Sequence, residues 1–396
     1  MPVAIAWGST LGSGARSRPG LASGRGGERL DVHQFVPSLL PRDAVGNHVL
    51  ATRRELRRAG AGATIWAGLI HPSLRRVARR YEDFPEVLPG ALPGALPGGK
   101  ASVILYEVAS WSGGVAESLL DRPEPKLLSY HNLTPAVYFS PYEAETAAWI
   151  RMAQAEVRRL CDGVRCAVAA SEFNARDLRE QGVEHVEVIP PHLGPCLRAR
   201  PDAATLRRLR SQRRGTELLF VGRLSPNKGH VHLIRLLAVL RAAVDPGARL
   251  LLVGAPGPPA YVQALQRMID RLAPGAVVLT GPLGEGELAA HYAHADVFVC
   301  LSEHEGFCIP IVEAMRAGVP VVACAAGAVA ETLGGAGAVV ETRDPAALAE
   351  VVWRVAHDGR LRGQLRERQL ARARELEEFP RTARLLAALR RAVELG

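Results

Sequence analysis

The sequence predicts an α/β protein of two Rossmann-like, doubly wound domains that face each other across a central cleft. Three observations lead to this prediction. The 396 residues are too many for one ordinary domain and suit two of nearly equal size. Short apolar runs of strand length alternate with helical patterns along the chain. A group of prolines and a glycine, Pro190, Pro191, Gly194 and Pro195, indicates a hinge near the middle.

Composition limits the class of protein. Apolar residues make up 48% and aromatic residues 5%, which suits a core built from Ala, Leu and Val. No apolar run approaches the roughly 20 residues of a membrane span. Residues 1–28 lack the pattern of a secretory signal and are interpreted as a flexible or leader segment, so we expect a cytoplasmic protein. The six cysteines form neither a C-x-x-C pair nor a metal-ligand group with histidine, so we expect reduced, mostly buried thiols.

The net charge of +9 comes almost wholly from arginine and favours acidic partners, such as a nucleotide phosphate, a phosphorylated acceptor or an anionic membrane face. We expect no nucleic acid partner, because no binding motif accompanies the charge. Two predicted helices carry basic stripes, which are either solvated or peripheral contacts for the cytoplasmic membrane face. The stripes are Arg53, Arg54, Arg57 and Arg58 on one helix, and Arg75, Arg76, Arg79 and Arg80 on the other.

The first domain is expected to cover residues 29–192. Strands are predicted at 29–36, 64–69, 102–109, 126–131, 164–170 and 186–189. Helices are predicted at 45–59, 144–160 and 174–182, with Gly60 and Gly182 at two of their ends. The repeating PGALPGALPGG of residues 89–99 is interpreted as an inserted surface loop, because it has little capacity to pack.

The second domain is expected to cover residues 193–378. Strands are predicted at 217–221, 249–254, 276–281, 297–301 and 319–323. Helices are predicted at 203–210, 230–243 and 311–317, and another begins at Asp344-Pro345. The last two helices, 361–377 and 381–395, are separated by Pro380.

One βαβ unit, ADVFVCLSEHEGFCIPIVEAMRAGVPVVA, carries the clearest functional signal. Pro310 suits a first helical turn and Gly318 a left-handed stop. Glu305 and Glu313 bracket the strand-to-helix turn, at the sheet edge where open α/β sheets bind ligands. The helix N-terminus there would favour a phosphate, and the carboxylates would suit hydroxyl groups, as in a sugar nucleotide. The alternative is a solvated acidic loop followed by a glutamate that favours the helix start.

The run E-G-F-C-I-P-I-V-E, followed by A-M-R-A-G-V-P-V-V, closely resembles the signature of the retaining glycosyltransferases of family 4, which have the GT-B fold. The resemblance implies that Glu305 contacts the transferred sugar and that Glu313 holds the ribose hydroxyls. The turn between them would also bind the donor, through Gly306, Phe307, Cys308 and Ile309. Cys308 stands where the family usually has glycine.

Other segments extend the resemblance over residues 29–396. In G-R-L-S-P-N-K-G, the family uses Arg223 and Lys228 to grip the donor diphosphate, beside Gly222; the alternative is a solvated basic turn. A Walker P-loop is excluded by the residue order. Leu283, in the loop after Thr280-Gly281, would hold the base. The family also implies that the final helix, 379–396, crosses back to the first domain.

Two further segments would lie on the first-domain side of the cleft. In S-Y-H-N-L-T-P, His131 would lie beside the donor sugar, with Asn132 in the cleft; a histidine hydrogen-bonded to a neighbouring loop is the alternative. In D-A-V-G-N-H, the family's first acceptor-side loop falls on Asp43, Gly46 and Asn47. Asp43 could instead be a simple helix cap.

The resemblance implies an enzyme that moves a sugar from a nucleotide-diphosphate sugar to an acceptor hydroxyl with retained anomeric configuration. The donor would lie mainly on the second domain and the acceptor on the first. No cofactor and no metal are expected, because the Asp-x-Asp motif of the other main glycosyltransferase fold is absent. The alternatives are a non-catalytic sugar-nucleotide-binding module and a sugar-nucleotide epimerase. The sequence does not name the base, the sugar or the acceptor, which could be a saccharide, a lipid-linked molecule or a small molecule.

Overall fold

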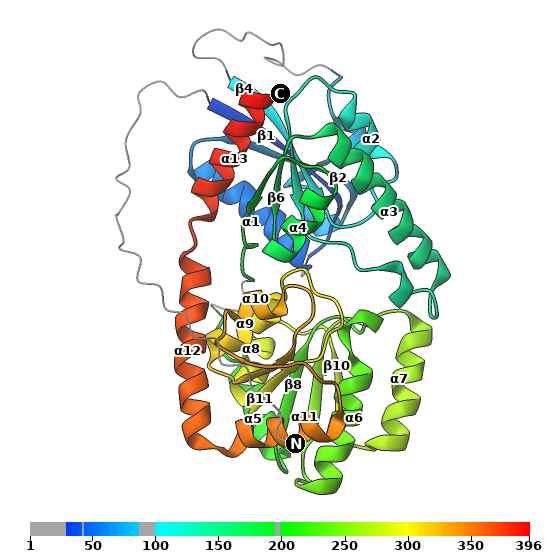
Figure 1. The fold of residues 1–396 in the computed structure, drawn as a ribbon, viewed down its shortest axis with the longest axis vertical. Helices are drawn as coiled ribbons and strands as arrows, with labels where there is room; N and C mark the ends of the chain where they lie inside the picture. The colour runs from blue at the N-terminus through cyan, green and yellow to red at the C-terminus, as the bar shows by residue number, and fades with distance from the viewer. Residues whose placement is uncertain (1–28, 42, 87–99, 195–198) are drawn as a thin grey trace.

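The computed structural model describes residues 29–41, 43–86, 100–194 and 199–396, and it places two α/β domains end to end (Figure 1). The predicted leader, the predicted loop at 89–99, and Pro195 of the predicted hinge lie outside the described residues. Along the described chain, no helix is both long enough and apolar enough to cross a membrane.

The first domain is built on a parallel sheet of seven strands in the order β3-β2-β1-β4-β5-β6-β7. The order reverses between β1 and β4, so the sheet has a topological switch point there. Its strands are β1 (Arg29–Leu39), β2 (Gly62–Ile70), β3 (Ala78–Arg80), β4 (Lys100–Val108), β5 (Lys126–Tyr130), β6 (Cys166–Ala169) and β7 (His185–Val188).

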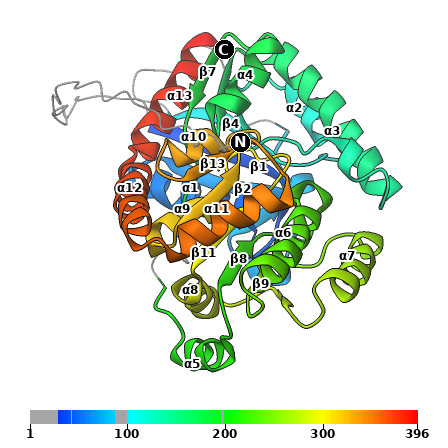
Figure 2. The ribbon, with the colours of Figure 1, turned by 60° about the horizontal axis from the view of Figure 1, so that its bottom comes forward.

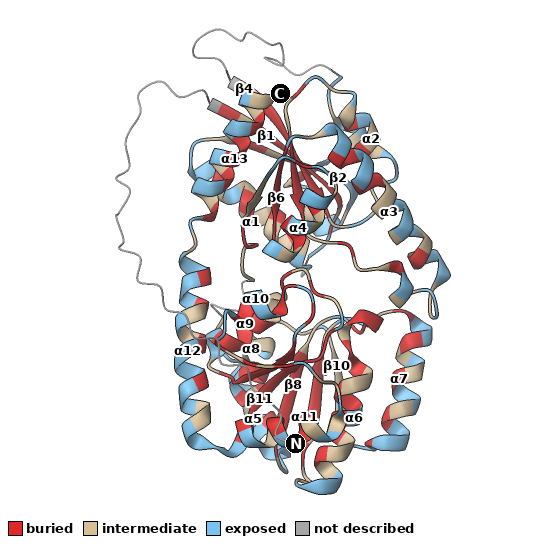
Figure 3. Cartoon of the chain, in the orientation of Figure 1, coloured by how far each residue is buried: buried red, intermediate tan, exposed pale blue. Residues whose placement is uncertain are grey.

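Helices cover both faces of this sheet, because successive residues of a strand point to opposite sides. Val103 and Leu105 of β4 pack toward one face with α1 and the C-terminal helix, whereas Ile104 and Tyr106 pack toward the other with α2, α3 and α4. Figure 3 shows the buried strands between helices with exposed outer faces. The helices are α1 (Ala44–Arg58), η1 (Pro72–Leu74), η2 (Tyr81–Asp83), α2 (Val115–Leu120), η3 (Ala136–Tyr138), α3 (Ala144–Gly163) and α4 (Glu172–Glu180).

The second domain repeats this plan with six parallel strands in the order β10-β9-β8-β11-β12-β13. Its switch point lies between β8 and β11. The strands are β8 (Glu217–Val221), β9 (Arg249–Val253), β10 (Val277–Gly281), β11 (Val297–Cys300), β12 (Val321–Cys324) and β13 (Ala338–Val340).

The helices of the second domain also pack on both sides of their sheet. On one side α6 contacts α7 and α11, and Figure 2 shows α6 and α11 from this end of the molecule. On the other side α8 contacts α5 and α9, and α12 contacts α9. The helices are α5 (Ala203–Gln212), η5 (Pro226–Lys228), α6 (His230–Ala243), α7 (Pro259–Leu272), α8 (Glu285–His294), α9 (Ile309–Ala317), α10 (Val329–Leu333), α11 (Pro345–His357) and α12 (Gly359–Glu378).

One sequence-based prediction is wrong. The basic residues Arg75, Arg76, Arg79 and Arg80 do not share a helix. Arg79 and Arg80 lie in the edge strand β3, which pairs with β2 through Ile65↔Ala78 and Ala67↔Arg80. The pairing with β2 satisfies backbone groups that a short isolated helix would have to satisfy alone, so tertiary contact overrides the local pattern.

The last helix, α13 (Arg381–Leu395), packs on the first domain although it follows the second in sequence (Figure 1). Leu389, with no exposed surface, and Leu385 join the core cluster that contains Leu30 and Val32. Burying each leucine side chain contributes about 1.5–3 kcal/mol to the free energy of unfolding. The helix is therefore part of the first domain's core.

Arg381 fixes the point at which the chain returns to the first domain. Its Nε donates to the carbonyls of Pro190 and Pro191 at 3.0 Å, and its Nη atoms donate to carbonyls at the end of α12, including that of Leu376. Burial lowers the pKa of Arg381 to about 10, so the guanidinium stays charged at neutral pH. One side chain thus joins the segment between the domains to the junction of α12 and α13.

We predict that Arg381→Met lowers the free energy of unfolding by about 2–4 kcal/mol, because several buried carbonyls lose a charged donor. The matched control is Arg384→Met, one helical turn later, which removes an exposed ion pair with Glu187 and should cost no more than about 1 kcal/mol. Thermal unfolding of both variants measures the difference. Equal midpoints for the two variants would contradict the role given to Arg381.

Candidate active site

Two loops meet at the switch point of the second sheet, and a glycine allows their contact. The loop after β8 holds Gly229 at a φ of +68°, and a Cβ there would lie 2.1 Å from the carbonyl oxygen of Leu301, which follows β11. Only glycine fits so close an approach at a left-handed φ. The contact brings Lys228, just before the glycine, over the acidic loop after β11.

Lys228 and Glu305 form an ion pair at this junction. The Lys228 Nζ lies 2.9 Å and 2.8 Å from the two carboxylate oxygens, and Ser302 Oγ donates to Glu305 Oε1 at 2.7 Å. The Glu305 residue is only 6% exposed. Burial alone would lower the pKa of Lys228, but the Glu305 carboxylate, together with the Cys308 and Cys300 thiols, raises that pKa. The Lys228 ammonium therefore stays charged, and it faces the Glu305 carboxylate.

The backbone of the acidic loop is held from the far side by a second close approach. The backbone N–H of Ala328 donates to the Glu305 carbonyl at 2.9 Å, and Gly327 lies so close that a Cβ would come within 2.2 Å of the same oxygen. Thr332 Oγ1 donates to the carbonyl of Phe307. The position of the loop is therefore set by α10 and the turn before it.

The N-terminus of α9 follows directly after this loop. The helix begins at Ile309, with Pro310 in its first turn, and Cys308 occupies the N-cap without a side-chain cap hydrogen bond. Its first N–H groups are thus a suitable environment for an anion. The φ of Cys308 is +71°, which is uncommon for a residue with a side chain.

Glu313 lies one turn into α9, and it contacts Tyr292 and the segment between the domains. Tyr292 OH donates to Glu313 Oε2 at 2.8 Å, and a Cβ on Gly194 would lie 2.9 Å from Glu313 Oε1. Burial raises the pKa of Glu313, and the hydrogen bond from Tyr292 partly opposes that rise. The two glutamates of the predicted pair thus lie in different environments, since Glu305 faces a cation and Glu313 a phenol.

The remaining predicted donor residues border the same edge of the sheet. Gly222 follows β8 and packs close to the Phe220 ring, and Arg223 is exposed, with its Nε donating to Pro256 at 3.4 Å. Arg223 is thus directed to the loop after β9 and not to the Lys228–Glu305 pair. Leu283, in the loop after β10, is partly buried against the second domain's core.

The first domain touches the acidic loop directly through the segment after β5. A Cβ on Gly306 would lie 2.8 Å from Asn132 Cβ and 2.9 Å from the His131 carbonyl oxygen, so no larger residue fits there without movement. His304 Nε2 donates to Asn132 Oδ1 at 2.6 Å, and Ser171 Oγ donates to the Gly306 carbonyl at 2.8 Å. The structure thus brings Asn132 and His131 together with the donor-side loop.

A second polar contact joins the two domains, between α10 and the start of α4. Glu331 of α10 accepts hydrogen bonds from the backbone N–H groups of Glu172 and Phe173 at 2.7 Å and 3.3 Å. These groups are the first of α4, so a carboxylate from one domain satisfies the helix N-terminus of the other.

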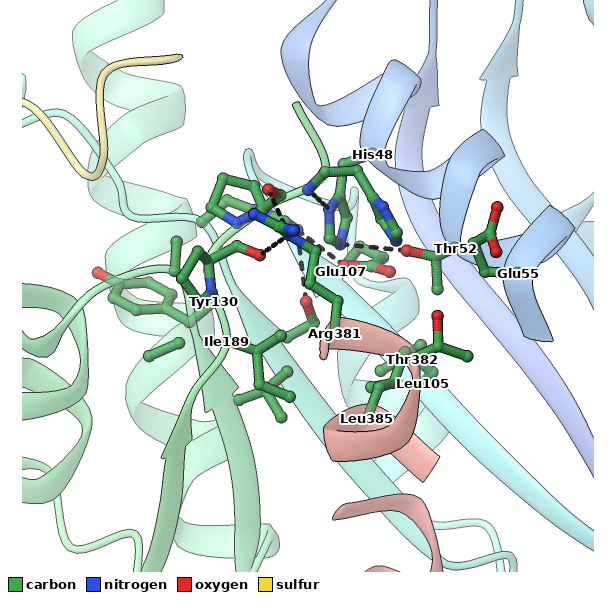
Figure 4. Close-up of a pocket in the computed structure, with 18 of the residues that line it drawn as sticks. His48, Thr52, Glu55, Leu105, Glu107, Tyr130, Ile189, Arg381, Thr382 and Leu385 are labelled. Carbon is green, nitrogen blue, oxygen red and sulfur yellow. Dashed lines mark hydrogen bonds and ion pairs between the residues drawn. The ribbon is translucent and has the colours of Figure 1, made fainter. Parts of the chain in front are cut away.

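The sequence does not predict that His131 belongs to a polar cluster with Glu107, His48 and His192. His131 Nε2 donates to Glu107 Oε2 at 2.8 Å, and the His48 ring lies 4.8 Å from the His131 ring and 5.3 Å from that of His192. Figure 4 shows His48, Glu107 and Arg381 directed into one pocket from α1, β4 and α13. Burial, together with the nearby His131, His192 and Arg381, holds the pKa of His48 well below its usual range.

Within the part of the chain that the structure describes, two groups of side chains have the types and spacing that a metal ion could use. They are His48, Glu107 and His131, and Cys300, Glu305 and Cys308, and within each group the ligand atoms lie within 4.8 Å of one another. In the second group the carboxylate already has a partner outside the group, because both oxygens of Glu305 face Lys228. In the first group Glu107 accepts from His131, which is itself a member of the group.

The predicted acceptor-side loop forms the start of α1. Asp43 is exposed, and its Oδ2 accepts from the Gly46 N–H at 2.9 Å, so the carboxylate acts as a helix cap, the alternative considered for it. A Cβ on Gly46 would come within 2.4 Å of the Leu40 carbonyl oxygen. The Asn47 N–H donates to the Asp43 carbonyl.

Comparisons with solved structures match the whole architecture. Sucrose-phosphate synthase from Thermosynechococcus elongatus superposes with a TM-score of 0.69 at 20% identity, covering 93% of this chain and 100% of that one. Anabaena HepE in complex with UDP and glucose gives a TM-score of 0.70 at 20% identity, covering 91% and 99%. The chain therefore has the GT-B fold, as the sequence predicted.

Sequence comparisons then give the family. The family model described as Glycosyl transferases group 1 matches residues 215–358. The GDP-mannose-dependent alpha-mannosyltransferase of Mycobacterium tuberculosis is 30% identical over 332 residues, which are 75% of this chain and 78% of that protein. The chain belongs to the group 1 glycosyl transferases.

A second relative from Mycobacterium tuberculosis is similar over a shorter part. The GDP-mannose-dependent alpha-(1-6)-phosphatidylinositol monomannoside mannosyltransferase is 31% identical over 238 residues, which are 56% of this chain. In that alignment the chain spans 59% of the relative's length.

We predict that Gly306→Ala loosens the contact between the domains, because the added methyl group meets Asn132 and His131 closer than van der Waals distance. Overpacking of this kind costs about 1–3 kcal/mol, which separation of the domains would relieve. Small-angle X-ray scattering should show a larger radius of gyration. The control is Gly363→Ala in α12, where a methyl group meets open space. An unchanged radius for Gly306→Ala would count against a tight contact at this point.

Proposed function

We propose that the protein is a glycosyltransferase that moves a sugar from a nucleotide-diphosphate sugar to an acceptor hydroxyl, with retention of anomeric configuration and without a metal. The observation that carries the proposal is the Lys228–Glu305 pair, held at 2.8–2.9 Å beside the N-terminus of α9. A cation and a helix N-terminus side by side suit a diphosphate, and an adjacent carboxylate suits sugar hydroxyls. Membership of the group 1 glycosyl transferases supports the same function.

Each residue of the site has a role in this proposal. Lys228, Arg223 and the N–H groups of α9 stabilise the negative charge that builds on the departing diphosphate. Glu305 binds hydroxyls of the transferred sugar, and Glu313 binds those of the ribose. The acceptor hydroxyl attacks from the face that the diphosphate leaves, and a diphosphate oxygen takes its proton. His131, oriented by Glu107, would lie on the first-domain side of the sugar.

GDP-mannose is the first donor to test, because the relative with 30% identity is named as GDP-mannose-dependent. UDP-glucose is the second, since HepE was solved with UDP and glucose. A ligand present at a hundred times its Kd adds about 2.7 kcal/mol to the stability of the protein, so a thermal-shift screen ranks the candidates. The acceptor in this proposal is a saccharide, a lipid-linked molecule or a small molecule.

Two other functions fit the same fold. A non-catalytic binding module would bind the donor without hydrolysing it. A transferase, by contrast, should hydrolyse its donor slowly when no acceptor is present. A sugar-nucleotide epimerase would convert one donor sugar into another with no acceptor. Product analysis after incubation with donor alone separates all three functions, and a transferase should release the nucleotide diphosphate with an unchanged sugar.

We expect Lys228→Met to reduce kcat by about 10²–10³-fold, the scale for removing one preorganised donor from a transition state. Methionine keeps much of the apolar stem, so affinity for the donor should fall less. Glu313→Gln should mainly raise the donor KM, because bonds to the ribose change little along the reaction. Steady-state kinetics with each variant provide the test, and a kcat for Lys228→Met within a few-fold of the parent at saturating donor would refute the leaving-group role.

Turnover should survive EDTA, because Lys228 already places a positive charge where a metal would otherwise bind the diphosphate. Rates measured before and after chelation, and after added Mg²⁺ or Mn²⁺, check this. Loss on chelation with recovery by either ion would refute metal independence.

The exposed arginines of the first domain support a further proposal, that the protein binds an anionic membrane face. Arg54, Arg57 and Arg58 are exposed on α1, although Glu55 pairs with two of them. Each basic residue near such a surface contributes about 1 kcal/mol. Salt-sensitive co-sedimentation with vesicles containing phosphatidylserine is expected for the parent and should weaken in Arg57→Gln/Arg58→Gln. No difference from neutral vesicles would favour a soluble acceptor.

A further inference from the structure

A cysteine stands at each end of the acidic loop of the candidate donor site. Cys300 is the last residue of β11 and Cys308 is the N-cap of α9. Their Sγ atoms lie 3.9 Å apart, in direct contact. Among the described cysteines, no other pair has its sulfur atoms in recorded contact; Cys324, for example, donates to the Thr342 carbonyl at 3.4 Å.

The two thiols differ in access and are linked to the ion pair. Cys300 is fully buried, whereas Cys308 is partly exposed. Cys300 Sγ donates to Ser302 Oγ at 3.5 Å, and Ser302 in turn donates to Glu305. A change at the sulfur pair is therefore transmitted to the carboxylate that holds Lys228.

The local backbone is also unusual at this point. Cys308 has the left-handed φ of +71°, and strained conformations of this kind gather at switch regions and ligand sites. The hydrogen bond with Cys300, followed by burial, raises the pKa of the Cys308 thiol, which keeps it protonated at neutral pH. Cys300 and Cys308 are both free thiols in the structure.

We propose that Cys300 and Cys308 are a site of reversible disulfide formation within the donor loop. The oxidant is a hydroperoxide such as hydrogen peroxide. One sulfur attacks the peroxide, takes an oxygen to become a sulfenic acid and releases water. The second sulfur then displaces that oxygen as a second water. Two thiols thus lose two protons and two electrons, and one hydrogen peroxide becomes two water molecules.

The disulfide would bring the two ends of the acidic loop closer together. Its S–S bond is about 2.05 Å long, so the sulfurs must approach by nearly 2 Å. The N-cap of α9 moves with Cys308, and Cys300 loses the S–H that it donates to Ser302. This effect on the donor rests on the proposed function, but the disulfide itself does not.

The experiment treats the whole protein with hydrogen peroxide, alkylates the remaining thiols and maps its tryptic peptides. The expected product is a peptide of residues 272–316 that is lighter by two hydrogens, resists alkylation and regains both thiols after dithiothreitol. Cys300→Ser must abolish this product. The matched control Cys324→Ser, which changes a buried thiol of the same domain, must retain it.

A second experiment measures the binding of GDP-mannose to the reduced and to the oxidised protein by calorimetry. Oxidation should weaken its binding by about tenfold or more, as expected for losing a charge-assisted contact, and dithiothreitol should restore it. The ratio of oxidised to reduced affinity should approach one in Cys300→Ser.

The two measurements separate the possible failures. Independent oxidation of the two sulfurs, or a disulfide that joins other cysteines, overturns the proposal whatever the protein binds. A disulfide at this site with unchanged GDP-mannose affinity overturns its effect on the donor loop. Reduced protein that binds neither GDP-mannose nor UDP-glucose, yet forms this disulfide, contradicts the proposed function and supports the site.

Discussion

The Lys228–Glu305 pair is the constraint on which the rest of the site depends. Two charges that lie 77 residues apart in the chain are removed from much of the solvent, and only their mutual attraction and added hydrogen bonds offset that cost. The loops after β8 and β11 must therefore stay within hydrogen-bond distance. Strand order supplies the proximity, because these strands are neighbours where the order reverses, and Gly229 allows the backbones of the two loops to approach.

Local signals explain why much of the fold could be predicted from sequence. The helix expected at 230–243 matches α6, because one apolar face and the glycine before it are sufficient signals. In the central unit, Gly318 ends α9 with a φ of +72°, as its type suggests. The segment 75–80 was misjudged since its strand exists only by pairing with β2. Periodicity within a segment contains no information about such a partner.

The residues of the candidate site also divide into those that the sequence could predict and those that it could not. Glu305, Lys228 and Asn132 lie in short runs that could be recognised locally, and the structure brings them together. By contrast, His48, Glu107 and His192 come from α1, β4 and the segment between the domains. No spacing within the chain relates them. One signal was available for Glu107, a carboxylate within the apolar run of β4 that is fully buried, which implies a polar partner.

The crossing of α13 has a consequence for how the chain assembles. Leu385 and Leu389 complete a core cluster that otherwise contains the earliest described strand, with Leu30 and Val32. During synthesis this strand is made before the second domain, but the helix that covers it is made only after the second domain. Until then one face of the first sheet exposes apolar side chains, which makes the nascent chain prone to association. The second domain, whose core lacks residues of α13, can fold before the first is complete.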